Sequence, residues 1–394
     1  MKTRPFDIIL IGATGFTGRR AARYLKTHGK GLHIGLGARN SERLNILAIE
    51  LGYNEGSLFV VNTLQKEQLD KVTALAKIVI STAGPFSLYG EQVIASCVEH
   101  GTHYLDITGE VDFIYEMIEK YGDLALQNKC KLIPFSGFDS VPADISAYLL
   151  SKKFDSPKEL NIKAYYSISG GFNGGTIASM MNKFESGDFK TMSNPRLIMQ
   201  GSEQQLSNQS GTNSLGFNSD IKRWTAPFIM GAINSKVVYR SASLFRIFEQ
   251  PYAEAISYSE HSSFGKRYNP FSFIMVTSLL IALKVLGPYS WFRTLIKKIA
   301  PNPGEGPSEK TIEEGFFKLK AIAKDQDGNQ KSLSMSYSGD PGNKSTVFFV
   351  CESALALLDD KYTSNDRFGF LTPTTAFNNH FIERLVDKGL KISF

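Results

Sequence analysis

The chain has 394 residues, of which 42% are hydrophobic and 21% charged, a composition typical of a globular protein with two domains and a sizeable core. Its net charge is +6, and its three cysteines are too far apart for a metal-ligand pattern or a disulfide framework. These features argue against a disulfide-rich secreted protein and favour a reducing, cytoplasmic location without a signal peptide.

A glycine-rich turn follows the first predicted strand. The apolar run 8–11 ends at Gly12, and Gly15 and Gly18 follow at three-residue spacing before a helix-compatible stretch. A dinucleotide site requires this order, because the glycines keep the turn tight, admit the phosphates and let the helix pack on the strand. The helix start offers free N–H groups and a positive dipole end to the pyrophosphate. We therefore predict a dinucleotide site; a glycine turn that binds nothing is the alternative.

The end of the second predicted strand, 32–38, indicates which dinucleotide binds. Sites that prefer NAD usually carry Asp or Glu about twenty residues after the glycines, to accept from the ribose 2′-hydroxyl. No residue in 34–41 is acidic. Arg39 can pair with a 2′-phosphate and Ser41 can add a hydroxyl, although a solvated surface arginine is the alternative. We predict NADP in preference to NAD.

Short strands and helices continue to alternate up to about residue 135. The further predicted strands are 57–62, 77–82, 104–107 and 131–135, and the helices between them are 69–76, 92–100 and 113–128. This alternation predicts a doubly wound parallel sheet of the α/β class, in which ligands lie at the carboxyl ends of the strands. The predicted cofactor contacts are Gly12, Thr14, Gly15, Phe16, Thr17, Gly18, Arg39, Ser41, Asn62, Ala83, Gly84, Pro85 and Gly109.

Hydride transfer also needs a group that supplies a proton. Tyr104 and Asp106 occupy alternate positions of one predicted strand and therefore share a face. Asp139 follows the sixth predicted strand. A core tyrosine at 104 and a helix cap at 139 are the structural alternatives. We predict Tyr104, Asp106 and Asp139 as catalytic residues, and we predict no metal site, because the chain has neither an HExxH motif nor a cysteine pair.

Beyond residue 150 the alternation weakens. Two strands are predicted at 315–324 and 331–338, an apolar helix at 346–358 and a last helix at 373–390. The last of these begins with a proline and ends before a glycine-containing turn, which is the usual placement of both residues.

All of the excess positive charge lies in residues 261–304. This segment holds six basic residues and no Asp or Glu, and the 44 basic residues of the chain less these six equal its 38 acidic ones. It is apolar and lacks a nucleic-acid-binding motif, and its apolar run 273–283 is too short for a membrane span. The apolar face of its second predicted helix consists of Trp291, Phe292, Leu295, Ile296 and Ile299. We predict contact with a membrane or lipid surface; packing on the protein's own core or at a dimer interface is the alternative.

Motifs along almost the whole chain resemble those of the saccharopine dehydrogenase-like oxidoreductases. They are GATGFTGR (12–19), AGPF (83–86), GTHYLDITGE (101–110), GFDSVPAD (137–144), GGTIASM (174–180), GPSE (306–309), SGDPG (338–342), ESALAL (352–357) and GFLTPTTAF (369–377). The branch that they resemble most is the trans-acting enoyl reductase group of bacterial lipid synthesis.

The resemblance implies a domain organisation. It implies an N-terminal Rossmann domain, a second α/β domain on a mixed sheet and a C-terminal helix that returns to the first domain. We accordingly predict an NADP-binding domain over 1–145, a substrate or dimerisation domain over 146–358 and the returning helix within 359–394.

The predicted function is an NAD(P)H-dependent oxidoreductase that reduces a lipid-like or carrier-bound enoyl substrate by hydride transfer. Two alternatives stay open. One is an NADP-binding regulatory or lipid-surface protein without turnover, and the other is a saccharopine-type amino-acid dehydrogenase, which needs cationic clamps for carboxylates. A homodimer is compatible with the sequence, and nucleic acid is not an expected partner.

Overall fold

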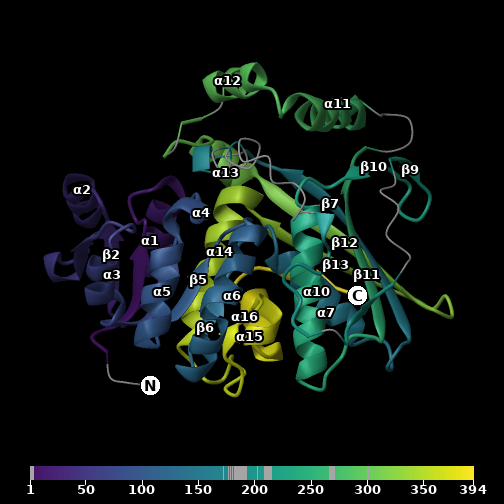
Figure 1. Cartoon of the computed structure of the whole chain (residues 1–394). Coiled ribbons are helices and arrows are strands. Elements are labelled where there is room, and N and C mark those ends of the chain that lie inside the picture. Colours follow the sequence, from purple (N-terminus) through teal and green to yellow (C-terminus); the bar gives the residue numbers. More distant parts are fainter. Residues whose placement is uncertain are drawn as a thin grey trace.

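The computed structural model describes residues 4–171, 173–175, 177, 179, 181, 193–201, 203–207, 215–265, 271–299, 301–302 and 304–394. Within them, the strands form two sheets that lie beside each other, with helices packed on and between them (Figure 1). The first sheet lies to the left in that view and the second to the right.

The first sheet confirms the predicted doubly wound fold. Its described strands are parallel and follow the order β14-β6-β5-β4-β1-β2-β3. The chain starts in the middle, moves out to β3 and then crosses back to β4, so the switch point lies beside β1. The strands are β1 (Phe6–Ile11), β2 (Ile34–Ala38), β3 (Leu58–Val60), β4 (Ala76–Ser81), β5 (His103–Asp106), β6 (Lys131–Ile133) and β14 (Gly369–Phe370).

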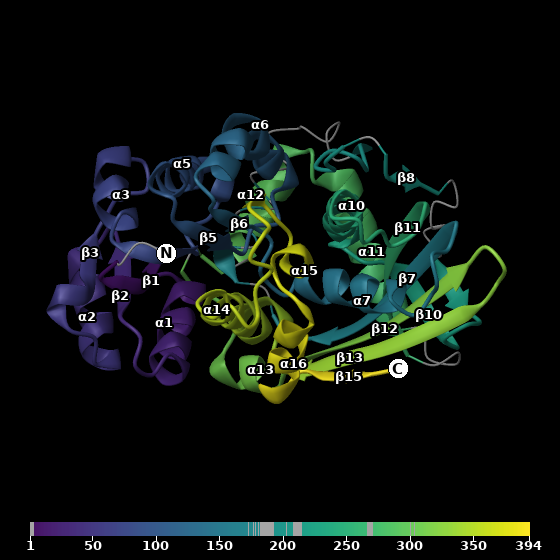
Figure 2. The same cartoon turned by 90° about the horizontal axis from the view of Figure 1, so that it is seen from below.

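Helices cover both faces of this sheet (Figure 2). Ile8 and Leu10 of β1 belong to the core under α1 and α14, whereas Ile9 and Ile11 belong to the core under α3, α5 and α6. Because successive side chains of a strand point to opposite faces, a central strand of such a sheet is apolar throughout. The helices are α1 (Phe16–His28), α2 (Ser41–Leu51), α3 (Lys66–Thr73), α4 (Phe86–Tyr89), α5 (Glu91–His100), α6 (Val111–Gln127) and α14 (Thr346–Leu357).

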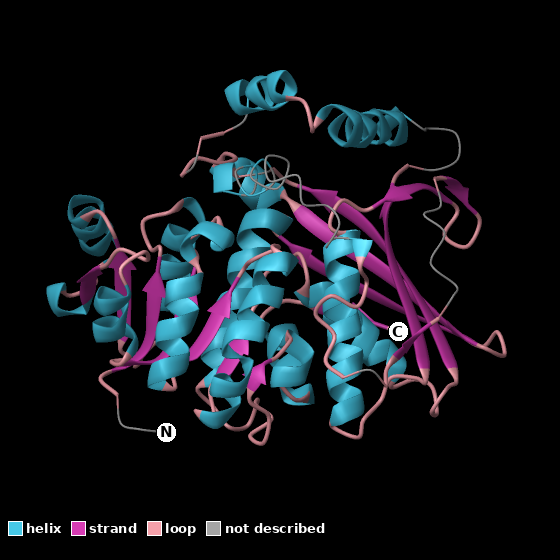
Figure 3. Ribbon diagram, in the orientation of Figure 1, coloured by secondary structure: helices cyan, strands magenta, loops and turns pink. Residues whose placement is uncertain are grey.

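The second sheet is mixed, as the family resemblance implies. Its order is β15-β13-β12-β7-β11-β10-β9, with β8 paired to β11; β7 runs parallel to β11 and antiparallel to β12. Its strands are β7 (Glu159–Ser169), β8 (Gln205–Leu206), β9 (Gly216–Asn218), β10 (Arg223–Pro227), β11 (Ala255–Ser263), β12 (Phe316–Asp325), β13 (Gln330–Ser338) and β15 (Lys391–Ser393). Helices α7 (Val141–Ser151) and α10 (Gly231–Ile247) pack on it, between the two sheets (Figure 3).

The predicted single helix over 373–390 is wrong. The structure has two short helices, α15 (Pro373–Ala376) and α16 (Asn379–Asp387), followed by β15. A capping box between Thr372 and Thr375 begins α15, which ends where Phe377 becomes extended. The Asn378 side chain then accepts from the backbone N–H of His380 at 3.0 Å, which starts a new helix. The break turns α16 against α14, and it sends β15 to pair with β13 of the second sheet.

Three further helices lie in the second half of the chain. They are α11 (Phe271–Leu286), α12 (Ser290–Ile299) and α13 (Glu309–Glu314). Within the described parts of the chain, no helix combines the length and the apolar character that crossing a membrane would require.

Candidate functional site

The turn between β1 and α1 is closely packed at its first and third glycines. Gly12 has a φ of +84°, and a Cβ there would lie 2.9 Å from the hydroxyl of Thr82. A Cβ on Gly18 would lie 2.1 Å from the carbonyl oxygen of Gly12. Neither position has room for a side chain, because the loop at Thr82 packs against Gly12 and the start of α1 packs against the turn at Gly18.

The second glycine has a single close neighbour. A Cβ on Gly15 would meet only the carbonyl oxygen of Gly12, at 3.2 Å, and the φ of Gly15 is −71°. Gly15 is the N-cap of α1, which has no capping side chain and no acidic residue in its first turn. The first N–H groups of α1 are thus left for an anion, so the turn fits a pyrophosphate. Thr14 and Phe16 are partly exposed beside it, and Thr17 is buried.

The residues expected at the adenosine end lie on adjacent loops. Arg39 directly follows β2 and is exposed, and Ser41 is the first residue of α2. Arg39 makes no ion pair with a described residue, which leaves its guanidinium available to a 2′-phosphate. The side-chain oxygen of Asn62 already has a partner, because it accepts from the backbone N–H of Leu64 at 3.1 Å.

The loop after β4 is held in place by Glu110. This carboxylate accepts from the backbone N–H groups of Phe86 at 2.8 Å and Ser87 at 2.9 Å, at the start of α4. It thereby fixes the predicted contacts Ala83, Gly84 and Pro85, which directly precede these two donors. A carboxylate at a short helix start is a capping arrangement.

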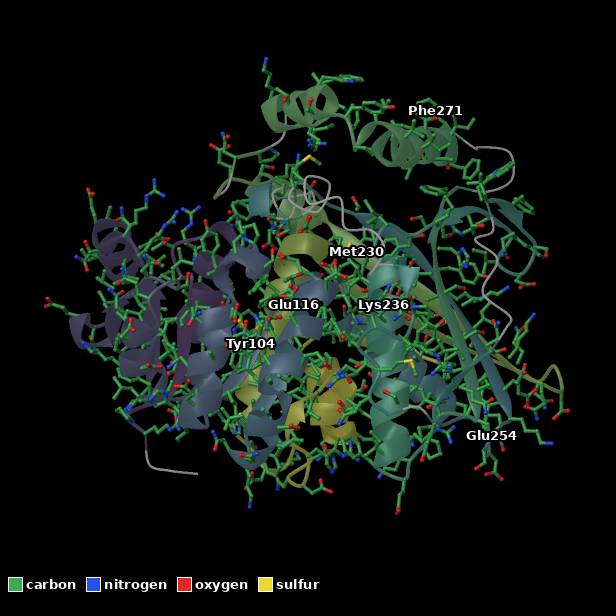
Figure 4. All side chains as sticks on the ribbon, viewed as in Figure 1. Tyr104, Glu116, Met230, Lys236, Glu254 and Phe271 are labelled. Atoms are coloured by element: carbon green, nitrogen blue, oxygen red, sulfur yellow. The ribbon has the colours of Figure 1, made fainter. Side chains whose placement is uncertain are left out.

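Gly109 lies where the two halves of the molecule meet. A Cβ at this position would be 3.4 Å from the terminal methyl of Met230. Met230, which Figure 4 labels, is the N-cap of α10. The carboxyl edge of the first sheet and the start of α10 therefore border the same region.

Tyr104 and Asp106 form a pair inside the protein. Both are fully buried, and the Tyr104 hydroxyl donates to Asp106 at 2.9 Å. Asp106 also accepts from the backbone N–H groups of Thr108 at 3.0 Å and Phe135 at 3.2 Å, and burial raises its pKa to about 7. The pair anchors the loops that follow β5 and β6. Its catalytic role stays a prediction.

Asp139 lies in the loop after β6 and differs from this pair. It is partly exposed and forms no hydrogen bond with a described residue. The surrounding protein raises the pKa of its carboxyl to about 6 by desolvation. The helix-cap alternative for Asp139 does not apply in this structure, because Ser140 is the N-cap of α7. A carboxyl with a raised pKa and no partner is a candidate for proton transfer.

Glu260 is a second carboxyl where the two sheets meet, and it was not among the residues predicted from the sequence. It lies in β11 and is 3% exposed. Its carboxyl accepts from the Tyr258 hydroxyl at 2.8 Å, the Asn234 amide at 2.8 Å and the Tyr166 hydroxyl at 3.2 Å. Burial nevertheless raises its pKa to about 7, and the negative charge of Asp139 raises it further. The two carboxyls are thus electrostatically coupled.

One sequence signal could have revealed Glu260. Ile256, Tyr258 and Glu260 alternate in β11 and point to one face, which packs into the core. An acid at an inward position of an apolar strand is rarely found without a partner. Because no strand was predicted at 255–263, this alternation of inward-facing residues was not recognised.

Comparisons with known proteins relate the chain to one family of oxidoreductases. Residues 8–132 match the family model described as the saccharopine dehydrogenase NADP binding domain. A provisionally named trans-acting enoyl reductase of Mycobacterium tuberculosis is 31% identical over 413 residues, which cover 99% of this chain and 97% of that protein. The trans-acting enoyl reductase of Mycobacterium bovis is 30% identical over 414 residues, with 98% and 97% covered.

Among solved structures, apo saccharopine dehydrogenase (L-Glu forming) from Saccharomyces cerevisiae has the same fold. It matches with a TM-score of 0.54 and 13% identity, over 98% of this chain and 99% of that one. At this identity the likeness concerns the fold alone.

Proposed function

The chain belongs to the saccharopine dehydrogenase-like family of NADP-dependent oxidoreductases, in its trans-acting enoyl reductase branch, and from this premise we propose that it reduces an enoyl group on a lipid-like, carrier-bound substrate. The names of the full-length relatives support the enoyl group as the reacting group. We further propose that the carrier is a separate protein.

One observation carries the proposal. The open glycine turn after β1 and the carboxyl of Asp139 after β6 both lie at the carboxyl ends of strands in one parallel sheet. Ligands of doubly wound sheets bind along this edge. A cofactor held at Gly15 and a proton source at Asp139 would therefore lie along the same edge of the sheet, as a reductase requires.

The proposed chemistry divides the work between cofactor and protein. NADPH, when bound, supplies the hydride that adds to one carbon of the double bond. Asp139 in its protonated form donates a proton to the other carbon. Glu260, with a pKa raised to about 7, keeps a proton available beside it at neutral pH. Tyr258, Tyr166 and Asn234 hold the Glu260 carboxyl in place.

The proposal also covers the binding partners of the protein and its location in the cell. A lipid-like substrate accords with a peripheral contact between residues 261–304 and a membrane or lipid surface. A homodimer stays a prediction, as do the individual cofactor contacts.

The test is a comparison of substrates with the purified protein. We expect NADPH to be consumed with an enoyl thioester on a carrier protein, at a rate that depends on Asp139. The Gly15→Val variant is the matched control for cofactor dependence. Tight NADPH binding without consumption of any enoyl thioester would favour the regulatory alternative, and turnover of saccharopine-type imines alone would favour the amino-acid dehydrogenase.

A further inference from the structure

Helices α11 and α12 stand outside both sheets, at the top of the molecule in Figure 1. Figure 4 labels Phe271 at the start of α11. Large apolar side chains on the two helices are 48–71% exposed. They are Phe271, Ile274, Met275, Ile281, Val285, Trp291 and Leu295, and we call them the outer face. A group of exposed large apolar residues of this extent marks an interaction surface.

The outer face is not the face by which these helices pack on the protein. Phe273 stacks on Trp224 with ring centroids 5.0 Å apart, and it meets Phe264 edge-on at 6.1 Å. Phe292 is only 8% exposed. The sequence pattern placed Phe292 and Trp291 on one apolar face, and the structure divides them, with Phe292 buried and Trp291 exposed. Successive helix residues are about 100° apart, so Trp291 points out while Phe292 packs inward.

The spacing makes the outer face continuous along α11. Residues 271, 274, 281 and 285 recur at three, seven and four positions, which places them on one side of a helix. Trp291 and Leu295 are four positions apart on α12 and do the same there. Arg293 donates to the carbonyl oxygens of Gly287 at 3.1 Å and Pro288 at 2.6 Å, which closes the turn between the helices.

The net positive charge of residues 261–304 indicates which kind of surface the outer face binds. Residues 261–304 contain six cations and no Asp or Glu, and Lys298 is exposed on α12. A second copy docked through the same face would bring together two segments of like net charge, which is unfavourable. An anionic surface instead meets positive charge and apolar side chains together.

The length of α11 decides how such a surface is met. Its 16 residues span about 24 Å, which is less than the roughly 30 Å of a hydrocarbon core. The helix is therefore suited to lying in the interface and not to crossing it.

We propose that the outer face of α11 and α12 docks on a membrane with an anionic surface. The apolar side chains enter the interfacial layer, and Lys298, which is exposed on the same side of α12 as Trp291 seven positions earlier, meets the lipid phosphates. This docking is independent of the proposed reaction, because neither helix carries a residue of the glycine turn after β1, and neither carries Asp139 or Glu260.

Tryptophan fluorescence gives a direct test, because the chain has only Trp224 and Trp291. In a Trp224→Phe variant, Trp291 becomes the sole reporter. We expect its emission to move to shorter wavelength with vesicles of phosphatidylcholine and phosphatidylserine, and not with phosphatidylcholine alone. Co-sedimentation with the same vesicles should fall as salt rises from about 0.05 to 0.5 M, because surface charges are screened over a few ångströms at high salt.

Variants separate the apolar and charged contributions. Ile281→Ser with Val285→Ser should abolish vesicle binding, and Lys298→Glu should weaken it by about tenfold. The matched controls are Ile49→Ser, at an 84% exposed position on α2, and Lys30→Glu, at an exposed position after α1; both should bind as the original chain does. Unchanged NADPH affinity in every variant reports an intact fold.

Three results would overturn the proposal. The first is no binding to anionic vesicles at low salt, and the second is equal binding by the Ile281→Ser, Val285→Ser variant. The third is self-association in lipid-free solution that this double variant abolishes, which would assign the outer face to a second copy. Since these readouts involve no turnover, they stand or fall separately from the enoyl reductase activity.

Discussion

The side-chain nitrogen of Asn234 lies 2.8 Å from a carboxyl oxygen of Glu260, which ties the first turn of α10 to β11. The other end of the Asn234 amide accepts from the Ser140 hydroxyl at 3.1 Å. Ser140 follows Asp139 directly. A buried chain of hydrogen bonds therefore connects the second sheet to the catalytic edge proposed for the first, and it holds the two carboxyls at one junction.

Replacing Glu260 by Gln removes the group that titrates near neutral pH while keeping its shape. We expect kcat to fall by about a hundredfold, a typical contribution of general acid catalysis, with NADPH affinity unchanged. In the original chain, activity should decline as pH rises above about 7, because the carboxyl then loses its proton. Steady-state kinetics across pH measure both effects. Glu254→Gln, at an exposed position just before β11, is the control.

The same substitution should change how stability depends on pH. The pKa of Glu260 is raised from 4.5 to about 7 on folding, so the folded chain binds this proton more tightly than the unfolded chain does. Its contribution is present below about pH 4.5 and is lost as pH rises through 7, by about 3 kcal/mol in total. Urea unfolding of both proteins across this range should give a flatter profile for Glu260→Gln. Parallel profiles would contradict the raised pKa.

The glycine turn offers a test that separates binding from folding. Gly15→Val should abolish dinucleotide binding and leave the fold intact, because its φ of −71° suits any residue and a Cβ there would have one close neighbour, the Gly12 carbonyl oxygen at 3.2 Å. Gly18→Ala should instead destabilise the protein, because its Cβ would lie 2.1 Å from a carbonyl oxygen. Calorimetric titration with NADPH and thermal unfolding distinguish the two. Full NADPH affinity in Gly15→Val would refute the site.

Arg39 is expected to select the 2′-phosphate. A charge-assisted contact contributes about 1.5–3 kcal/mol, so Arg39→Ala should weaken NADPH binding by roughly ten- to a hundredfold and leave NADH affinity nearly unchanged. Lys30→Ala serves as a control for the general loss of one positive charge. Equal losses for NADPH and NADH would remove the selectivity role from Arg39.

Glu352 should be a structural carboxyl. It is fully buried in α14 and accepts from the Tyr24 hydroxyl at 2.8 Å and from Arg384 at 2.7 Å, so it joins α1, α14 and α16. Glu352→Ala leaves both donors without this partner and should cost about 3 kcal/mol in the free energy of unfolding. Chemical denaturation measures the loss. Glu383→Ala, at an exposed position of α16, should cost far less.

Local patterns in the sequence were enough for strands β1 to β6 of the first sheet and for the glycine turn after β1. Strands β1, β2 and β4 are apolar runs, and their glycines and helices follow at short range, so the predicted order agrees with the structure. Strands β14 and β15 were missed because two or three residues show no period, and they form only by pairing with β6 and β13. The prediction of one helix over 373–390 failed because Phe377 is extended and the Asn378 side chain caps a second helix, which an apolar pattern does not reveal.

The sequence by itself determined the strand–glycine–helix turn and the absence of an acid after β2, because both depend on neighbours in the chain. Only the tertiary structure decided that Glu260 lies beside Asp139, 121 positions earlier, since this requires α10 and the second sheet to pack against the carboxyl edge of the first. It also decided that Tyr104 is enclosed while Asp139 is accessible. Burial and long-range pairing depend on how distant segments pack, and no local periodicity records that.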